Sequence, residues 1–240
     1  MDENLLRRVL GAPKSTPIPS LYLETRSVPV SFIIKGRRVL YLHYLLNQPE
    51  ETLLSKMIHD QILNPMKNDW FSVANENLKE LGLDHYSLRD IQEMKKDTLK
   101  KLVRSAVEDV AFKYLKEEIQ KRNLKKMKNI VYGKFEMQEY LLSKKLNTTQ
   151  KKITFSARTG MLPVAYNFGQ KIPCFACEMS EDTDRHLLKC VVLKMACPDL
   201  LENTEYVYED IFGMDMMKVA KVSTLLRSAL RAREILRNNQ

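Results

Sequence analysis

Four cysteines and one histidine near the C-terminal end constrain the fold more than any other feature of the sequence. The cysteines lie within 24 residues, at positions 174, 177, 190 and 197, and the rest of the 240-residue chain has none. Two residues separate Cys174 from Cys177, and three separate His186 from Cys190. Two intervening residues let both thiolates reach one ion from a tight turn, and ligands at i and i+4 face the same side of a helical turn.

This spacing predicts a structural zinc site with four ligands in residues 174–190, which we call the knuckle. The ligands are Cys174, Cys177, His186 and Cys190. Thiolates combined with one imidazole favour a single zinc ion in a reducing compartment, and the polar residues 178–185 can loop out. Cys197 is left over, either as a buried thiol or as a substitute for Cys190. Two alternatives stay open: simple buried thiols, or a redox pair at 174 and 177.

Composition and periodicity predict a mainly α-helical fold, a helical bundle with a small C-terminal CCHC zinc knuckle followed by a helix. The chain has only seven glycines and nine prolines, whereas residues that favour helices are abundant. Helices are expected over 2–11, 20–26, 30–47, 50–63, 70–81, 98–122, 135–146 and 215–237, with a capped helix starting at 87 and an irregular basic stretch over 148–158. Residues 28–34 are also compatible with a strand. The predicted domains are 1–165, basic and helical, and 166–240, the knuckle with the C-terminal helix.

The charge of the chain points to a polyanionic partner, RNA or DNA. The net charge is +9, and residues 94–128 and 134–158 carry two adjacent basic runs, which can neutralise several phosphates. A solvated helix face is the ordinary explanation of one such run, but two together favour binding. The residues expected to contact phosphates are Lys95, Lys96, Lys100, Lys101, Lys121, Arg122, Lys125, Lys126, Lys144, Lys145, Lys151, Lys152 and Arg158.

The sequence lacks the motifs of several common classes of enzyme and of membrane and secreted proteins. The chain has no glycine-rich phosphate loop, no GxSxG elbow and no HExxH motif, so no catalytic residue is predicted. No segment approaches the roughly 20 apolar residues of a membrane span, and the first ten residues do not resemble a signal peptide. We therefore expect an intracellular protein.

Residues 155–190 resemble the C-terminal region of polyproteins from non-long-terminal-repeat (LINE-type) retrotransposons. In that family an RTxML segment and an Asn-Phe pair precede a Cys-x2-Cys … His-Leu-Leu-x-Cys knuckle. The matching positions are Arg158, Thr159, Met161, Leu162, Asn167, Phe168, Cys174, Cys177, Asp182, Thr183, His186 and Cys190. Residues 5–46 also resemble the segment where the thumb begins, after the reverse-transcriptase palm.

The chain departs from this family in its catalytic motifs. It contains no Asp-Asp pair of the kind that binds the polymerase metals. The site-specific class has a nuclease after the knuckle; here Asp199, Asp210 and Asp215 follow, without a Glu-x-Lys core. The resemblance thus implies a non-catalytic nuclear region that binds template RNA or target DNA. The alternatives are a module that binds a partner protein through acidic residues 197–213 and the C-terminal helix, and a nuclease remnant.

Overall fold

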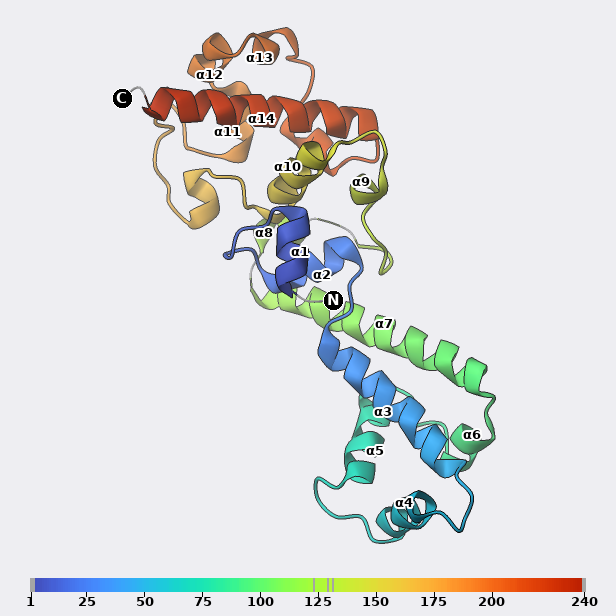
Figure 1. The fold of residues 1–240 in the computed structure, drawn as a ribbon. Coiled ribbons are helices and arrows are strands. Elements are labelled where there is room, and N and C mark those ends of the chain that lie inside the picture. The colour runs from blue at the N-terminus through green and yellow to red at the C-terminus, as the bar shows by residue number, and fades with distance from the viewer. Residues whose placement is uncertain (1–2, 123, 129, 131, 239–240) are drawn as a thin grey trace. The chain divides into compact units, whose positions relative to one another are not determined.

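The structure, a computed structural model, describes residues 3–122, 124–128, 130 and 132–238 and is mainly helical, as predicted (Figure 1). No β-strand occurs among these residues; an isolated bridge joins Pro173 and Glu181. The chain forms two units, the first Ser27–Glu118 and the second Asp2–Arg26 with Ile119–Gln240. In the described part of the chain, no helix is both long enough and apolar enough to cross a membrane.

The first unit contains α3 (Val30–Leu46), α4 (Leu53–Leu63), α5 (Trp70–Glu80), α6 (Leu88–Glu93) and most of α7 (Lys96–Lys121). The helices predicted over 30–47, 50–63, 70–81 and 98–122 are therefore confirmed. The strand alternative for 28–34 is wrong, because α3 begins within that segment.

Local sequence explains where the helices of the first unit begin. The side chains of Thr52 and Asp69 accept hydrogen bonds from backbone N–H groups in the first turns of α4 and α5. Ser87 and Asp90 form a capping box at the start of α6. Such caps satisfy N–H groups that have no partner within the helix.

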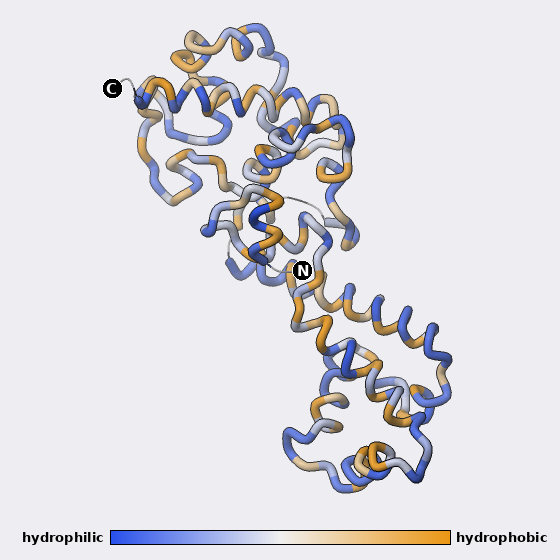
Figure 2. Tube along the Cα trace, in the orientation of Figure 1, coloured by the Kyte–Doolittle hydropathy of each residue, from blue (hydrophilic) through white to orange (hydrophobic). Residues whose placement is uncertain are grey.

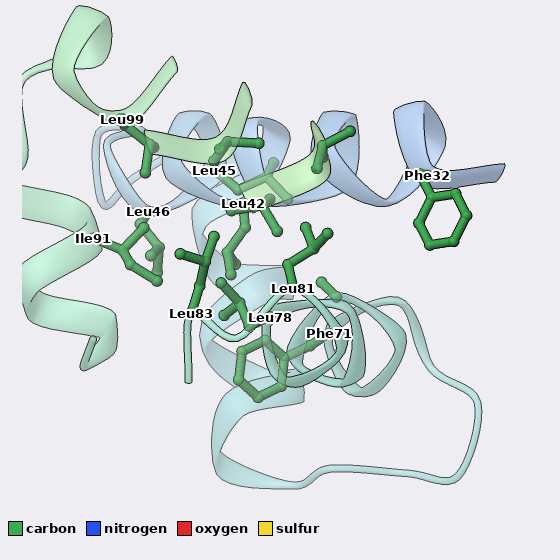
Figure 3. Close-up of a cluster of buried hydrophobic side chains, with 14 of the residues drawn as sticks. Phe32, Leu42, Leu45, Leu46, Phe71, Leu78, Leu81, Leu83, Ile91 and Leu99 are labelled. Atoms are coloured by element: carbon green, nitrogen blue, oxygen red, sulfur yellow. The ribbon is translucent and has the colours of Figure 1, made fainter. Parts of the chain in front are cut away.

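A hydrophobic core fills the first unit (Figure 3). Its members include Leu42, Leu45, Phe71, Leu78, Leu83, Ile91 and Leu99. Val103 and Val107 of α7 are buried, and Gly36 of α3 lies against these two side chains. A Cβ atom on Gly36 would lie 2.8 Å from Val107 Cγ2, so the close approach of α3 and α7 requires a glycine at this position.

The second unit contains the remaining elements, among them the last residues of α7. They are α1 (Glu3–Leu10), α2 (Ile18–Thr25), α8 (Lys125–Lys128), α9 (Glu139–Leu142), α10 (Thr148–Thr159), η1 (Ala165–Phe168), α11 (Asp184–Lys189), α12 (Val191–Ala196), α13 (Pro198–Glu202), η2 (Tyr208–Phe212) and α14 (Met216–Asn238). Helices α1, α2 and α14 confirm the predictions for 2–11, 20–26 and 215–237.

Two predictions for the middle of this unit are wrong. Residues 148–158, predicted to be irregular, form helix α10. Asn147 and Gln150 make a capping box at its start, and Gly160 ends it with φ +73°. Conversely, the helix expected over 135–146 is reduced to the single turn α9.

Helices α10 and α14 pack against each other in the second unit. Thr154 and Ser223, both fully buried, share a hydrogen bond of 2.8 Å between their hydroxyl groups where the helices meet. Along α14 the polarity alternates between hydrophilic and hydrophobic residues (Figure 2), and Val219, Val222 and Leu226 are fully buried. The predicted domain boundary after residue 165 therefore falls inside one unit, because α10, which precedes it, packs against α14, which follows it.

Candidate metal centre

The four predicted zinc ligands come together in the second unit. The ligand atoms of Cys174, Cys177, His186 and Cys190 all lie within 4.8 Å of one another. Cys174 Sγ is 4.0 Å from Cys190 Sγ, and Cys177 Sγ is 3.2 Å from His186 Nε2. Two sulfur atoms bound to one tetrahedral zinc, each at about 2.3 Å from it, lie about 3.8 Å apart. The group can therefore hold one metal ion, and Cys197 is not part of it.

A tight turn presents the first two cysteines. The Cys174 N–H donates to the Ser180 carbonyl at 2.7 Å, and the Glu178 N–H donates to the Cys174 carbonyl at 2.7 Å. Glu178 adopts a left-handed conformation with φ +56°, which lets the chain reverse direction after Cys177. The turn thus directs both thiols toward the same point, as the two-residue spacing predicts.

The other two ligands are His186, on α11, and Cys190, directly after it. Thr183 caps this helix by accepting a hydrogen bond of 3.2 Å from the His186 N–H. Cys190 follows the last helical residue, and its N–H donates to the His186 carbonyl at 2.7 Å. The predicted i and i+4 arrangement of the two ligands is therefore present.

The protonation of the ligands depends on their surroundings. Burial lowers the pKa of His186, which favours the neutral imidazole that binds metals. Burial raises the pKa of the Cys190 thiol to about 11. For Cys177, burial raises the pKa, but hydrogen bonds from the Met179 N–H and the neighbouring thiols outweigh burial and hold it below the ordinary value. A metal must therefore displace a tightly held proton from Cys190.

Buried contacts join the knuckle to α14. Asp182 accepts two hydrogen bonds from Arg233 and a third, at 2.7 Å, from the Ala165 N–H. Asp182 and Arg233 are 3% and 7% exposed. The guanidinium groups of Arg233 and Arg237 lie over the Phe175 ring, 4.9 and 5.2 Å from its centroid. Sequence reasoning missed these contacts because about 50 residues separate Asp182 from Arg233 and no local periodicity links them.

Two residues predicted to contact phosphates have other partners. Arg158 is 5% exposed and pairs with Glu24, with Nε 3.1 Å from Glu24 Oε2. Lys126 forms an ion pair with Asp184 and donates to Asn167 Oδ1 at 3.0 Å. These contacts correct the prediction for both residues, because Arg158 is buried, Lys126 is half-buried, and each cation already has a buried carboxylate partner in place of a phosphate.

The other residues predicted to bind phosphates lie mostly on the surface. Lys151 is half-buried and donates to the Leu141 carbonyl at 2.8 Å, and the side chain of Lys125 lies outside the described residues. The exposed ones are Lys95, Lys96, Lys100, Lys101, Lys121, Arg122, Lys144, Lys145 and Lys152.

The two units differ in charge. Residues 27–118 contain 14 Lys and Arg and 14 Asp and Glu, so the first unit has no net charge. The second unit contains 25 Lys and Arg and 16 Asp and Glu. The whole net charge of +9 therefore belongs to the unit that carries the metal centre.

The acidic residues considered for a nuclease remnant do not form a second centre. Among the described residues, the four knuckle ligands are the one group of three or more His, Cys, Asp or Glu that could hold a metal ion. Asp210 accepts from the Val207 N–H at 3.0 Å, and Asp215 accepts from the Met217 N–H at 2.9 Å. Both carboxylates thus cap helices.

Comparisons with models of protein families, with curated proteins and with solved structures find no match for this chain.

Proposed function

We propose that this chain is the non-catalytic, nucleic-acid-binding C-terminal region of a LINE-type reverse transcriptase, or of a host gene derived from one. In this proposal it binds template RNA or target DNA in the nucleus. One structural zinc ion, held by the four knuckle ligands, fixes the knuckle against α14.

The charge difference between the units is the observation that carries this proposal. A protein that holds phosphates needs a surface with more cations than anions. The first unit has no such excess, whereas the second unit carries the whole +9. Binding is therefore assigned to the second unit, and the exposed lysines of α7 in the first unit are assigned to solvation.

The residues that carry the family resemblance support the proposal through their contacts. Arg158 pairs with buried Glu24, and Asn167 Nδ2 donates to Asp184 Oδ1 at 2.8 Å. Asp182 binds Arg233, and Thr183 caps α11. Each of these side chains has a specific partner in the second unit, as expected of a motif that maintains one fold.

Zinc is the metal that suits this ligand set. Three thiolates and one imidazole form a closed four-coordinate site of the kind that zinc occupies structurally. No protein ligand position is left open for a substrate, so the role proposed for the ion is structural. The ion would link the turn that carries Cys174 to the end of the helix at Cys190, 16 positions later in the chain.

A matched pair of double variants tests the binding proposal. Lys144 and Lys145 are adjacent and exposed in the second unit, and Lys95 and Lys96 are adjacent and exposed in the first. Replacing Lys144 and Lys145 by Gln is expected to weaken binding to mixed-sequence RNA or DNA. The slope of log affinity against log salt should also fall by about 0.7–0.9 for each phosphate that the variant no longer neutralises. The K95Q/K96Q variant is expected to bind like the parent.

Two results would contradict this assignment. If the parent protein shows no salt-dependent retention on immobilised RNA or DNA, the nucleic-acid function is wrong and the protein-interaction alternative is favoured. If K95Q/K96Q loses as much affinity as K144Q/K145Q, binding is not confined to the second unit.

A further inference from the structure

A groove in the second unit is lined by four arginines, all of them on α14. It has a volume of about 570 Å³ and runs beside the C-terminal half of α14. Ile153 and Pro163 form part of its wall. The charged residues that line it are Arg227, Arg231, Arg233, Glu234 and Arg237.

The charges in this groove are not balanced. Arg233 is neutralised by Asp182, and Glu234 contributes one carboxylate. Three exposed guanidinium groups remain, those of Arg227, Arg231 and Arg237. Within the described residues, none of these three forms an ion pair. The groove therefore has an excess of two positive charges beside an apolar wall, and such a wall focuses the field on an anion.

We propose that this groove binds the phosphate backbone of a nucleic-acid strand through Arg227, Arg231 and Arg237. The inference rests on the proposed function and gives it a site outside the basic runs at 94–158. The three residues span ten positions of α14, which is about 15 Å along the helix axis. One strand of a B-form duplex carries about four phosphates over that length. Guanidinium groups bind phosphate oxygens in a bidentate manner.

The knuckle positions one of these arginines. The Phe175 ring lies between Cys174 and Cys177 in the chain and contacts the Arg237 guanidinium. The Asp182 carboxylate holds Arg233 one turn earlier on α14. Metal ligation thus orders the loop that supports one end of the groove. Arg227 and Arg231 are positioned by α14 itself and not by this loop.

Two double variants on the same helix test the groove. R227Q/R231Q removes two charges from it, and K218Q/K221Q removes two charges from α14 outside it. Two mixed-sequence probes are used, a single-stranded RNA and a DNA duplex. R227Q/R231Q is expected to lower the slope of log affinity against log salt by about 1.4–1.8. K218Q/K221Q should leave the slope unchanged, and R227K/R231K, which keeps the charge, should retain it. Zinc content and thermal unfolding are measured on every variant to verify the fold.

The outcomes separate the groove from the general function. If the parent binds with a steep salt dependence and R227Q/R231Q keeps that slope, the groove is not the binding site, while the proposed function stands. Equal losses in R227Q/R231Q and K218Q/K221Q would also exclude the groove, because net charge alone would then explain the effect. If the parent binds neither probe, the proposed function is overturned, and the groove with it.

Discussion

Replacing Arg158 alone by Met is expected to lower the free energy of unfolding of the second unit by about 3–5 kcal/mol. The guanidinium pairs with Glu24, which is fully buried, and donates to Gln138 Oε1 at 2.9 Å. Tyr132 donates a further hydrogen bond of 2.5 Å to Glu24. Without Arg158 the Glu24 carboxylate keeps the hydrogen bond from Tyr132 but has no cation beside it. A buried charge without a counter-ion destabilises the folded state.

A double variant separates the buried charge from the shape of the side chains. Glu24→Leu combined with Arg158→Met removes both charges and fills the site with apolar groups, which is often neutral for stability. The Tyr132 hydroxyl then has no acceptor, at a cost of about 1–3 kcal/mol. The double variant should therefore be more stable than Arg158→Met, although less stable than the parent protein.

Urea unfolding followed by two signals measures this effect. Trp70 is the single tryptophan and belongs to the first unit, so its fluorescence serves as an internal control. Hydrogen exchange at α2 and α10 reports the second unit, where Glu24 and Arg158 lie. The prediction is wrong if Arg158→Met lowers the free energy of opening measured by exchange at α2 and α10 by no more than it lowers the free energy of unfolding reported by Trp70.

Local patterns in the sequence predict those parts of the fold that local interactions determine. The helices α7 and α14 follow from their apolar periodicity, and α3 follows from a segment that is apolar on most sides. The metal group follows from ligands close together in the chain. The basic residues of 148–158 favour an irregular stretch, yet the segment forms α10. Its capping box, Asn147 with Gln150, can be read from the sequence and is the stronger signal.

Contacts between distant residues explain the remaining errors. The sequence predicts Arg158 as a surface cation because its partner Glu24 lies 134 residues earlier in the chain. The division into units escapes prediction for the same reason. The N-terminal helices α1 and α2 belong with residues 119–240, and α1 packs against α10. No periodicity or spacing within a short window contains such information.

Loss of the metal is expected to loosen the second unit and leave the first unit folded. Freshly purified protein should contain about one zinc per chain, since the closed ligand set binds at neutral pH. Cys177→Ser should lose most of it, because a hydroxyl is a poor substitute for a thiolate. Cys197→Ser is the matched control, since Cys197 lies outside the ligand group, and it should keep the full amount.

The contacts of the knuckle determine how far this loosening extends. Without the ion, the turn that carries Phe175 and Asp182 is no longer fixed to α11. The Asp182–Arg233 pair and the Phe175–Arg237 contact join this turn to α14. We therefore expect His186→Ala, or chelation of the parent, to speed hydrogen exchange in residues 170–200 and also in the C-terminal turns of α14. The local loss should amount to several kcal/mol, as for other structural zinc sites.

Residues 99–115 of α7 provide the comparison for this experiment. They contribute Val103 and Val107 to the core of the first unit, which contains none of the ligands. Their exchange should stay slow in the chelated protein. If these residues lose protection together with 170–200, the two units unfold as one, and the metal stabilises the whole chain. If the parent carries less than about a tenth of a zinc equivalent, the knuckle is a group of free thiols, and no zinc site of the expected affinity exists.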